Sequence, residues 1–154
     1  TALDFILGYL LPLLPLALLQ SLVCYGVAII LGLPVTGYIL YAAALMLPAA
    51  LFFLSTGLLC GSVLNVKQVG AVCGALFTNL TAWLSGTWFD LNLVGGAFRR
   101  IAHALPFVHA VELERAALRG SVSALAPHLF WVLGYAAAAT GLAVGLFLRQ
   151  MKRQ

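Results

Sequence analysis

The sequence contains very little charge: eight Lys or Arg and four Asp or Glu in 154 residues. A soluble domain usually has about 25% charged and about 45–50% apolar residues. Here 8% are charged and 64% hydrophobic, and the mean hydropathy is +1.09. A chain of this length cannot fold so as to hide that much apolar surface from water. The composition therefore excludes a soluble globular protein and predicts an integral membrane protein.

Several site signatures are also missing. The three cysteines, Cys24, Cys60 and Cys73, are isolated, without the CxxC or Cys/His spacing of a zinc site, so we expect them to fill gaps between helices. The basic residues form no single patch, and no polar domain is present to offer one. Despite the net charge of +4, this excludes a nucleic-acid partner. No GxxxxGK[ST] pattern occurs, so any ATP chemistry must come from another subunit.

The beginning of the sequence has no secretory signal. Such a signal needs a basic region before its apolar stretch, and the only early charge here is Asp4. The sequence starts at Thr1 and enters an apolar run almost at once. We therefore expect it to begin inside a longer chain.

Four apolar runs are long enough to cross a bilayer, which takes about 20 helical residues. They cover about 5–31, 38–64, 69–89 and 128–148. The sequence thus predicts an all-α integral membrane protein, with residues 1–154 forming one transmembrane domain of four spans.

Three of these runs hold two glycines four residues apart. Such a pair lies on one helix face and allows another helix to approach closely. The pairs are Gly57 and Gly61, Gly70 and Gly74, and Gly141 and Gly145. We expect them to pack helices within the chain, with a dimer interface or a mobile helix contact as the alternative.

Half of the charged residues fall within residues 99–119, between the third and fourth runs: Arg99, Arg100, Glu112, Glu114, Arg115 and Arg119. The segment 93–120 is otherwise apolar and helix-compatible, and Pro106 divides it into two pieces. Each piece is too short to cross a membrane, but it can dip in and return or lie at the interface. We therefore expect a re-entrant or interfacial two-helix hairpin between the last two spans.

In the second piece, Glu112, Arg115 and Arg119 share one helix face, where opposite charges support each other. A solvated amphipathic helix at the headgroups explains this pattern, and so does a gate or a ring that faces a substrate.

Glu114 points away from that face, towards an apolar one, and needs a partner from elsewhere. An unpaired charge near hydrocarbon costs about 2.5–3.5 kcal/mol. We expect Arg99 or Arg100, on the first piece, to be that partner.

One stretch carries a family resemblance. A run that ends in "LSGTWFDLNLVGG", then "AFRRIAHALPFVHAVELERAALRG", a last span and a basic tail resembles the ABC-2 type permeases, the membrane subunits of bacterial ABC exporters. The matching positions are Ser85-Gly86, Phe89-Asp90, Leu105-Pro106, Arg115 and Gly120. Asp90 is a departure, because many members have proline there.

The resemblance implies a six-helix fold with both ends in the cytoplasm and two short helices that re-enter the membrane from outside between the fifth and sixth helices. This chain would then hold helices three to six in the bacterial cytoplasmic membrane. Lys67 and the carboxyl-terminal tail would be cytoplasmic, and the hairpin would be external and half-buried.

The resemblance further implies an exporter subunit that works as a homo- or heterodimer with an ATP-binding cassette subunit and needs no cofactor in this chain. Our candidates for gating and the transport pathway all lie in or beside the hairpin: Gly86, Pro106, Glu112, Glu114, Arg115 and Arg119. The sequence does not indicate the substrate.

Three other functions find less support. A serine protease would need a glycine before Ser85-Gly86 in a GxSG-like turn. A metal site on His109 and Glu112 would need a third ligand, and the only candidates are the distant His103 and His128. Histidines that lie at the membrane interface without binding a metal explain the pattern more simply. A non-transporting anchor or assembly protein has little reason to carry a charged hairpin.

Overall fold

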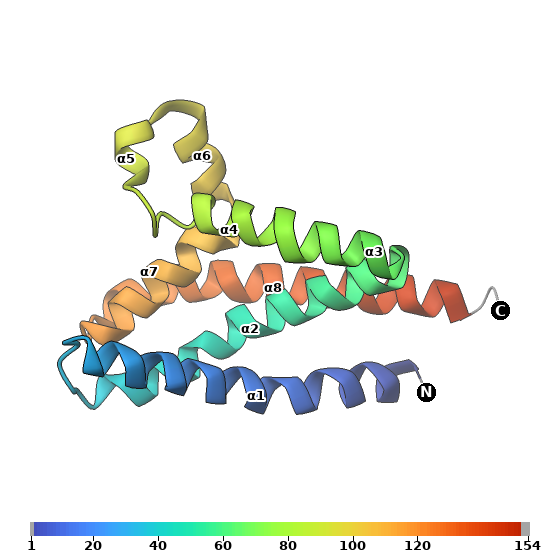
Figure 1. The fold of residues 1–154 in the computed structure, drawn as a ribbon, viewed down its shortest axis with the longest axis horizontal. Helices are drawn as coiled ribbons and strands as arrows, with labels where there is room; N and C mark the ends of the chain where they lie inside the picture. The colour runs from blue at the N-terminus through green and yellow to red at the C-terminus, as the bar shows by residue number, and fades with distance from the viewer. Residues whose placement is uncertain (1, 152–154) are drawn as a thin grey trace.

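The computed structural model describes residues 2–151 and contains helices and no strands within that range. The helices are α1 (Ala2–Ile30), α2 (Tyr38–Val63), α3 (Val66–Val69), the π-helix η1 (Gly70–Phe77), α4 (Thr78–Leu84), α5 (Leu91–Val94), α6 (Gly96–Ala104), α7 (Pro106–Leu118) and α8 (Val122–Met151) (Figure 1). The all-α prediction is confirmed for these residues.

Three helices are long and apolar enough to span a membrane: Ile6–Ile30, Tyr38–Val63 and Val122–Arg149. Large apolar side chains on them are exposed, for example Ile30 at 84% and Phe130 at 75%. In water this exposure would be costly, but against lipid it is the expected state of a spanning helix. Three of the four predicted spans therefore appear as single helices.

The third predicted span has a different form. Instead of one α-helix over 69–89, the chain forms α3, η1 and α4 in succession and leaves the helix after Leu84. Thr78 donates its hydroxyl to the carbonyl of Cys73, five residues earlier, at 3.0 Å. Beyond the helix, Gly86 has a φ of +70°, which only glycine adopts readily. The span prediction missed this early end because the residues that follow carry no charge before Asp90.

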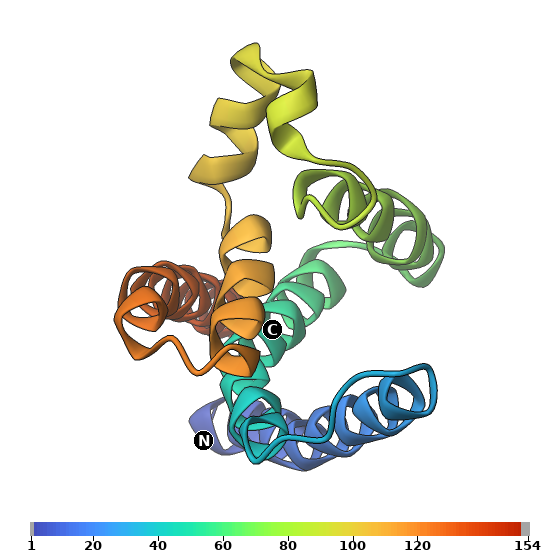
Figure 2. The ribbon, with the colours of Figure 1, turned by 90° about the vertical axis from the view of Figure 1, so that its left-hand side faces the viewer.

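The bundle is built around α2 and α8, with α1 against α2 and α7 between α2 and α8 (Figure 2). Small residues allow this close packing: Ala42 on α2 and Ala117 on α7 are fully buried beside Leu113. Ser55 on α2, also fully buried, lies 2.8 Å from the Thr140 hydroxyl on α8. Thr140 donates to the carbonyl of Ala136, so Ser55 is the donor to Thr140.

The predicted hairpin forms two main helices, α6 and α7, with Pro106 in the first turn of α7. Only α7 lies in the bundle; α5 and α6 form an arm that stands away from it (Figure 1). A second apolar cluster holds the base of the arm, where Leu91 and Ala102 pack near Phe107. At the start of the arm, the Asp90 carboxylate accepts the N–H of Asn92 at 2.8 Å, so this departure from the family pattern caps α5.

The six paired glycines do not pack helices together within the described residues. An added Cβ at any of them (Gly57, Gly61, Gly70, Gly74, Gly141 or Gly145) would meet no heavy atom within 4 Å. The expectation of close packing inside the chain is therefore wrong at these positions. The close approach occurs instead at Gly120, where an added Cβ would lie 2.8 Å from the ring of Tyr38.

Candidate transport cavity

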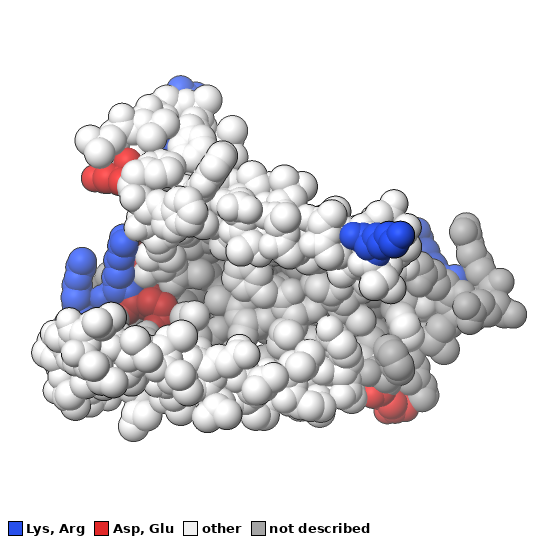
Figure 3. Space-filling model, viewed as in Figure 1, with Lys and Arg blue, Asp and Glu red and all other residues white. Residues whose placement is uncertain are grey.

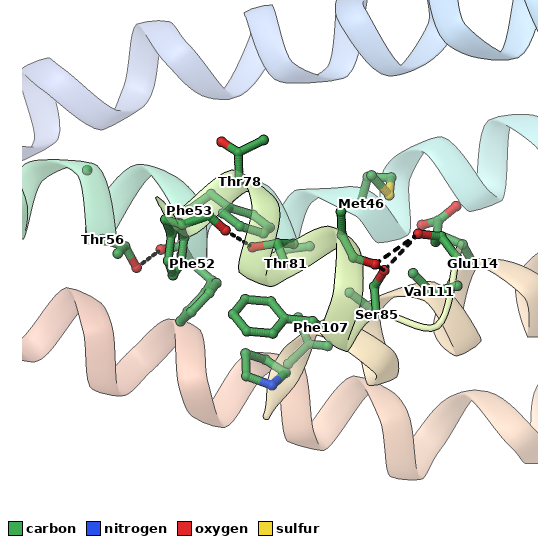
Figure 4. A pocket seen from close by; sticks show the side chains of 18 of the residues that line it. Met46, Phe52, Phe53, Thr56, Thr78, Thr81, Ser85, Phe107, Val111 and Glu114 are labelled. Atoms are coloured by element: carbon green, nitrogen blue, oxygen red, sulfur yellow. Dashed lines mark hydrogen bonds between the residues drawn. The ribbon is translucent and has the colours of Figure 1, made fainter. Parts of the chain in front are cut away.

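A cavity of about 640 Å³ lies between α2, the η1–α4 segment and α7. This volume is in the range that holds a drug-sized molecule. Figure 4 shows Thr56 at one end and Glu114 at the other, with phenylalanine rings between them. The cavity is mostly apolar. Its polar groups are a few hydroxyls and two charged side chains of α7, Glu114 and Arg115.

Four phenylalanines form the middle of the wall. Phe52 and Phe53 come from α2, Phe77 from η1 and Phe107 from α7, with ring centroids 5.3–6.4 Å apart. These separations are typical of aromatic pairs that attract each other. The rings therefore join η1 to α2 and α7, with which it makes few other contacts.

Glu114 is the most constrained charged group of the site. The Tyr25 hydroxyl on α1 donates a hydrogen bond to its Oε2, while its Oε1 is buried and has no partner among the described residues. Burial raises the pKa of the Glu114 carboxyl above its usual range, and the Tyr25 hydrogen bond opposes this rise. Glu114 also lines a second cavity of about 510 Å³ between α1 and α2, so its side chain lies at the partition between the two.

The predicted pairing of Glu114 with Arg99 or Arg100 is wrong. Both arginines lie on α6, in the arm that stands away from the bundle, and both are exposed. They line a small pocket with His103 instead. The sequence correctly predicted that Glu114 has a partner on another element, but that partner is Tyr25 of α1. A lone tyrosine in an apolar run was the only available signal, because the sequence does not show that α1 and α7 are neighbours.

The other predicted gating residues are placed as follows. Arg115 and Glu112 form the expected pair on one face of α7, with Nη1 2.8 Å from Oε1. Arg119 is exposed at the end of the same helix. Pro106 is buried and lines the cavity, whereas Gly86 lies in the turn that leaves α4.

The three histidines meet where α6, α7 and α8 join. His109 Nε2 donates to the carbonyl of His103 at 2.9 Å, since a carbonyl can only accept. In the neutral ring, Nδ1 then accepts from His128 Nδ1, also at 2.9 Å. The Trp131 ring stacks on His109 with a centroid distance of 5.0 Å. His109 thus makes structural bonds with both ring nitrogens, and Glu112 pairs with Arg115 rather than with His109.

The chain matches a known protein family. The model of the ABC-2 type transporter family matches residues 1–118, from the start of the sequence to the end of α7. A search of curated proteins and a search of solved structures found no match. The match covers both cavities' main walls, including the phenylalanines and Glu114. The chain therefore belongs to the ABC-2 type transporter family and is a multi-pass membrane permease component of an ABC-type transporter.

Proposed function

We propose that this chain is part of an exporter permease, which moves a substrate out across the bacterial cytoplasmic membrane. ATP hydrolysis in a separate ATP-binding cassette subunit drives the movement, and two permease copies or halves work together. ATP binding and release shift the balance between inward-open and outward-open arrangements of the helices.

The observation that carries this proposal is the cavity itself. A membrane anchor needs only apolar helices, whereas a transporter needs a space that changes its access from one side to the other. Here a cavity of about 640 Å³ lies beside a spanning helix in a chain of the ABC-2 type transporter family. One of its walls, η1–α4, packs loosely, and π-helical turns are frequent at functional sites.

We infer that the segment from Val66 to Leu84 is a fourth membrane crossing. It consists of three consecutive helical pieces of 4, 8 and 7 residues. Together they are nearly as long as the helix of about 20 residues that crosses a bilayer. In support, α1 begins, α3 begins and α8 ends at the same end of the molecule (Figure 1).

That end, which holds Lys67 and Arg149, would be cytoplasmic, as the resemblance to the ABC-2 type permeases implies. The preference of basic residues for the cytoplasmic side does not decide the orientation by itself, because four arginines lie towards the opposite end. Figure 3 shows basic side chains at both ends of the long axis and an uncharged flank between them. The opposite end, with the arm and α7, would face outwards, with α7 tucked back among the spans as the re-entrant part.

The gate in this proposal is α7. It is linked to α1 through Glu114 and Tyr25 and to α8 through His109 and His128. A shift of α7 would break these links and open the two cavities that share Glu114. Gly120, with a φ of +68°, would be the hinge to α8.

The test is ATP-dependent efflux from vesicles that contain the full permease and its ATP-binding subunit. We expect transport that requires hydrolysable ATP and that is lost when the catalytic lysine of the partner's P-loop is replaced. The second candidate, a non-transporting anchor or assembly protein, predicts no efflux with any partner, and that result would overturn the proposal.

A further inference from the structure

The hydroxyl groups that line the large cavity all donate their hydrogens to hydrogen bonds within the protein. Thr56, Thr78 and Thr81 each donate to a main-chain carbonyl four or five residues earlier, at 2.8, 3.0 and 2.7 Å. A hydroxyl that donates to its own helix retains its lone pairs and can only accept from a ligand.

The same holds for the remaining two hydroxyls, Ser85 and Thr87. Their oxygens lie 2.9 Å apart, and the carbonyl of Ala82 accepts from them at 3.0 and 3.4 Å. Whichever of the two donates to the other, both hydrogens are used within this group. All five hydroxyls that line the cavity therefore present hydrogen-bond acceptors.

Donors are scarce in the same wall. Arg115 is the only basic side chain that lines the described cavity, and it is half-exposed and bound to Glu112 at 2.8 Å. The Cys73 thiol is at most a weak donor. A neutral or anionic ligand that needs donors would leave its acceptors unpaired in this apolar space, which is unfavourable.

The other features of the wall favour positive charge. Glu114 is the one acidic residue that lines the cavity, and its Oε1 has no partner in the described part of the chain. The phenylalanine rings offer an aromatic surface on which the apolar body of a cationic molecule can stack. Acceptors, a carboxylate and aromatic faces together form the complement of an apolar molecule with an ammonium group.

We propose that this cavity binds an apolar organic cation with N–H donors, whose ammonium group lies near Glu114 and the acceptor hydroxyls of residues 81–87, while its apolar body lies among the four phenylalanines. This inference rests on the proposed function in one respect: only if the chain is a transporter is the bound molecule its transported substrate. Binding itself requires neither ATP nor the partner subunit.

The experiment measures binding to the full chain in lipid nanodiscs. The probe is 1-pyrenemethylammonium, detected by energy transfer from tryptophan to pyrene and corrected for protein-free nanodiscs. Two analogues separate charge from hydrogen bonding: neutral 1-pyrenemethanol, and the trimethylammonium derivative, which keeps the charge but has no N–H. We expect the ammonium to bind about 10- to 100-fold more tightly than the alcohol, with the trimethyl cation between them.

Two variants locate the site. Glu114→Gln should weaken binding of the ammonium about 10- to 100-fold and leave binding of the alcohol unchanged. Asp90→Asn is the matched control, because it removes one exposed carboxylate outside this cavity and asparagine caps a helix equally well. If Glu114→Gln fails to fold, Thr81→Val still tests the site and should weaken ammonium binding about 2- to 12-fold.

Equal affinities for ammonium and alcohol, or variants that do not change the ammonium affinity, would overturn the assignment. An absence of saturable binding by any of the three probes would also overturn it. Ammonium binding without ATP-dependent efflux would leave the site standing and contradict the transport function. Efflux together with a preference for the neutral probe would support the transport function and contradict the proposed cation site.

Discussion

Gly120 shows how one residue fixes the join between α7 and α8. Its φ of +68° is a conformation that residues with a Cβ rarely adopt, and an added Cβ would lie 2.8 Å from Cζ of Tyr38. The tyrosine ring thus occupies the space that a side chain would need. Gly120 was one of the positions that carried the family resemblance, and the structure supplies a steric reason for glycine there.

We predict that Gly120→Ala lowers the free energy of unfolding by about 1–3 kcal/mol. Gly145→Ala, in α8, meets nothing within 4 Å and should be neutral or slightly stabilising to the monomer. Thermal unfolding of the purified protein in detergent measures both variants. Equal destabilisation by the two would show that the Tyr38 contact is not what requires glycine at position 120.

Glu114 gives a second prediction at this scale, on the dependence of stability on pH. Its pKa is higher in the folded protein than in the unfolded chain, so the folded protein holds a proton that the unfolded chain has already lost. Its contribution to stability is therefore present at low pH and lost as the pH rises through the raised pKa. We expect Glu114→Gln to raise the melting temperature relative to wild type more at about pH 8 than at about pH 5.

Asp90→Asn serves as the control here, because the Asp90 carboxylate is exposed. A Glu114→Gln effect of the same size at both pH values would contradict the account, since it would mean that ionisation of this carboxyl does not affect stability.

Among the helices, the glycine pairs lead to a prediction about the dimer. Their faces are open in the described part of the chain, so we expect them to allow close packing against another chain. We predict that Gly141→Leu weakens association of two permease copies while it leaves the monomer folded. Cross-linking in membranes, with helix content by circular dichroism as the control, measures this. Unchanged cross-linking would assign these glycines to lipid contact.

Sequence periodicity was sufficient for the long helices but not for their neighbours. Apolar runs over 5–31 and 38–64 correspond to α1 and α2, and Pro106 correctly marked the division between α6 and α7. The arm and the π-helical turns could not be predicted, because both depend on contacts between segments distant in the sequence. For the same reason Glu114 was recognised as needing a partner, while Tyr25 could not be identified.

Over the whole molecule, the site arises where three elements meet around one cavity. The four phenylalanines and five hydroxyls come from α2, from the 66–84 segment and the turn after it, and from α7, and none of these is a site alone. Of the gating candidates predicted from the sequence, the structure places Glu114, Arg115 and Pro106 in the cavity wall. The aromatic and hydroxyl residues were missed because, in a membrane helix, they resemble ordinary packing.

The central claim is that the arm and α7 lie on the outer side and the link at Lys67 on the cytoplasmic side. Its most direct test is single-cysteine labelling in intact cells, after Cys24, Cys60 and Cys73 are replaced by alanine. An impermeant maleimide added outside should label a cysteine at Ile101, which is 54% exposed on α6, and should leave one at Lys67 unlabelled until the membrane is permeabilised. Labelling of the Lys67 position from outside, with Ile101 protected, would contradict the account.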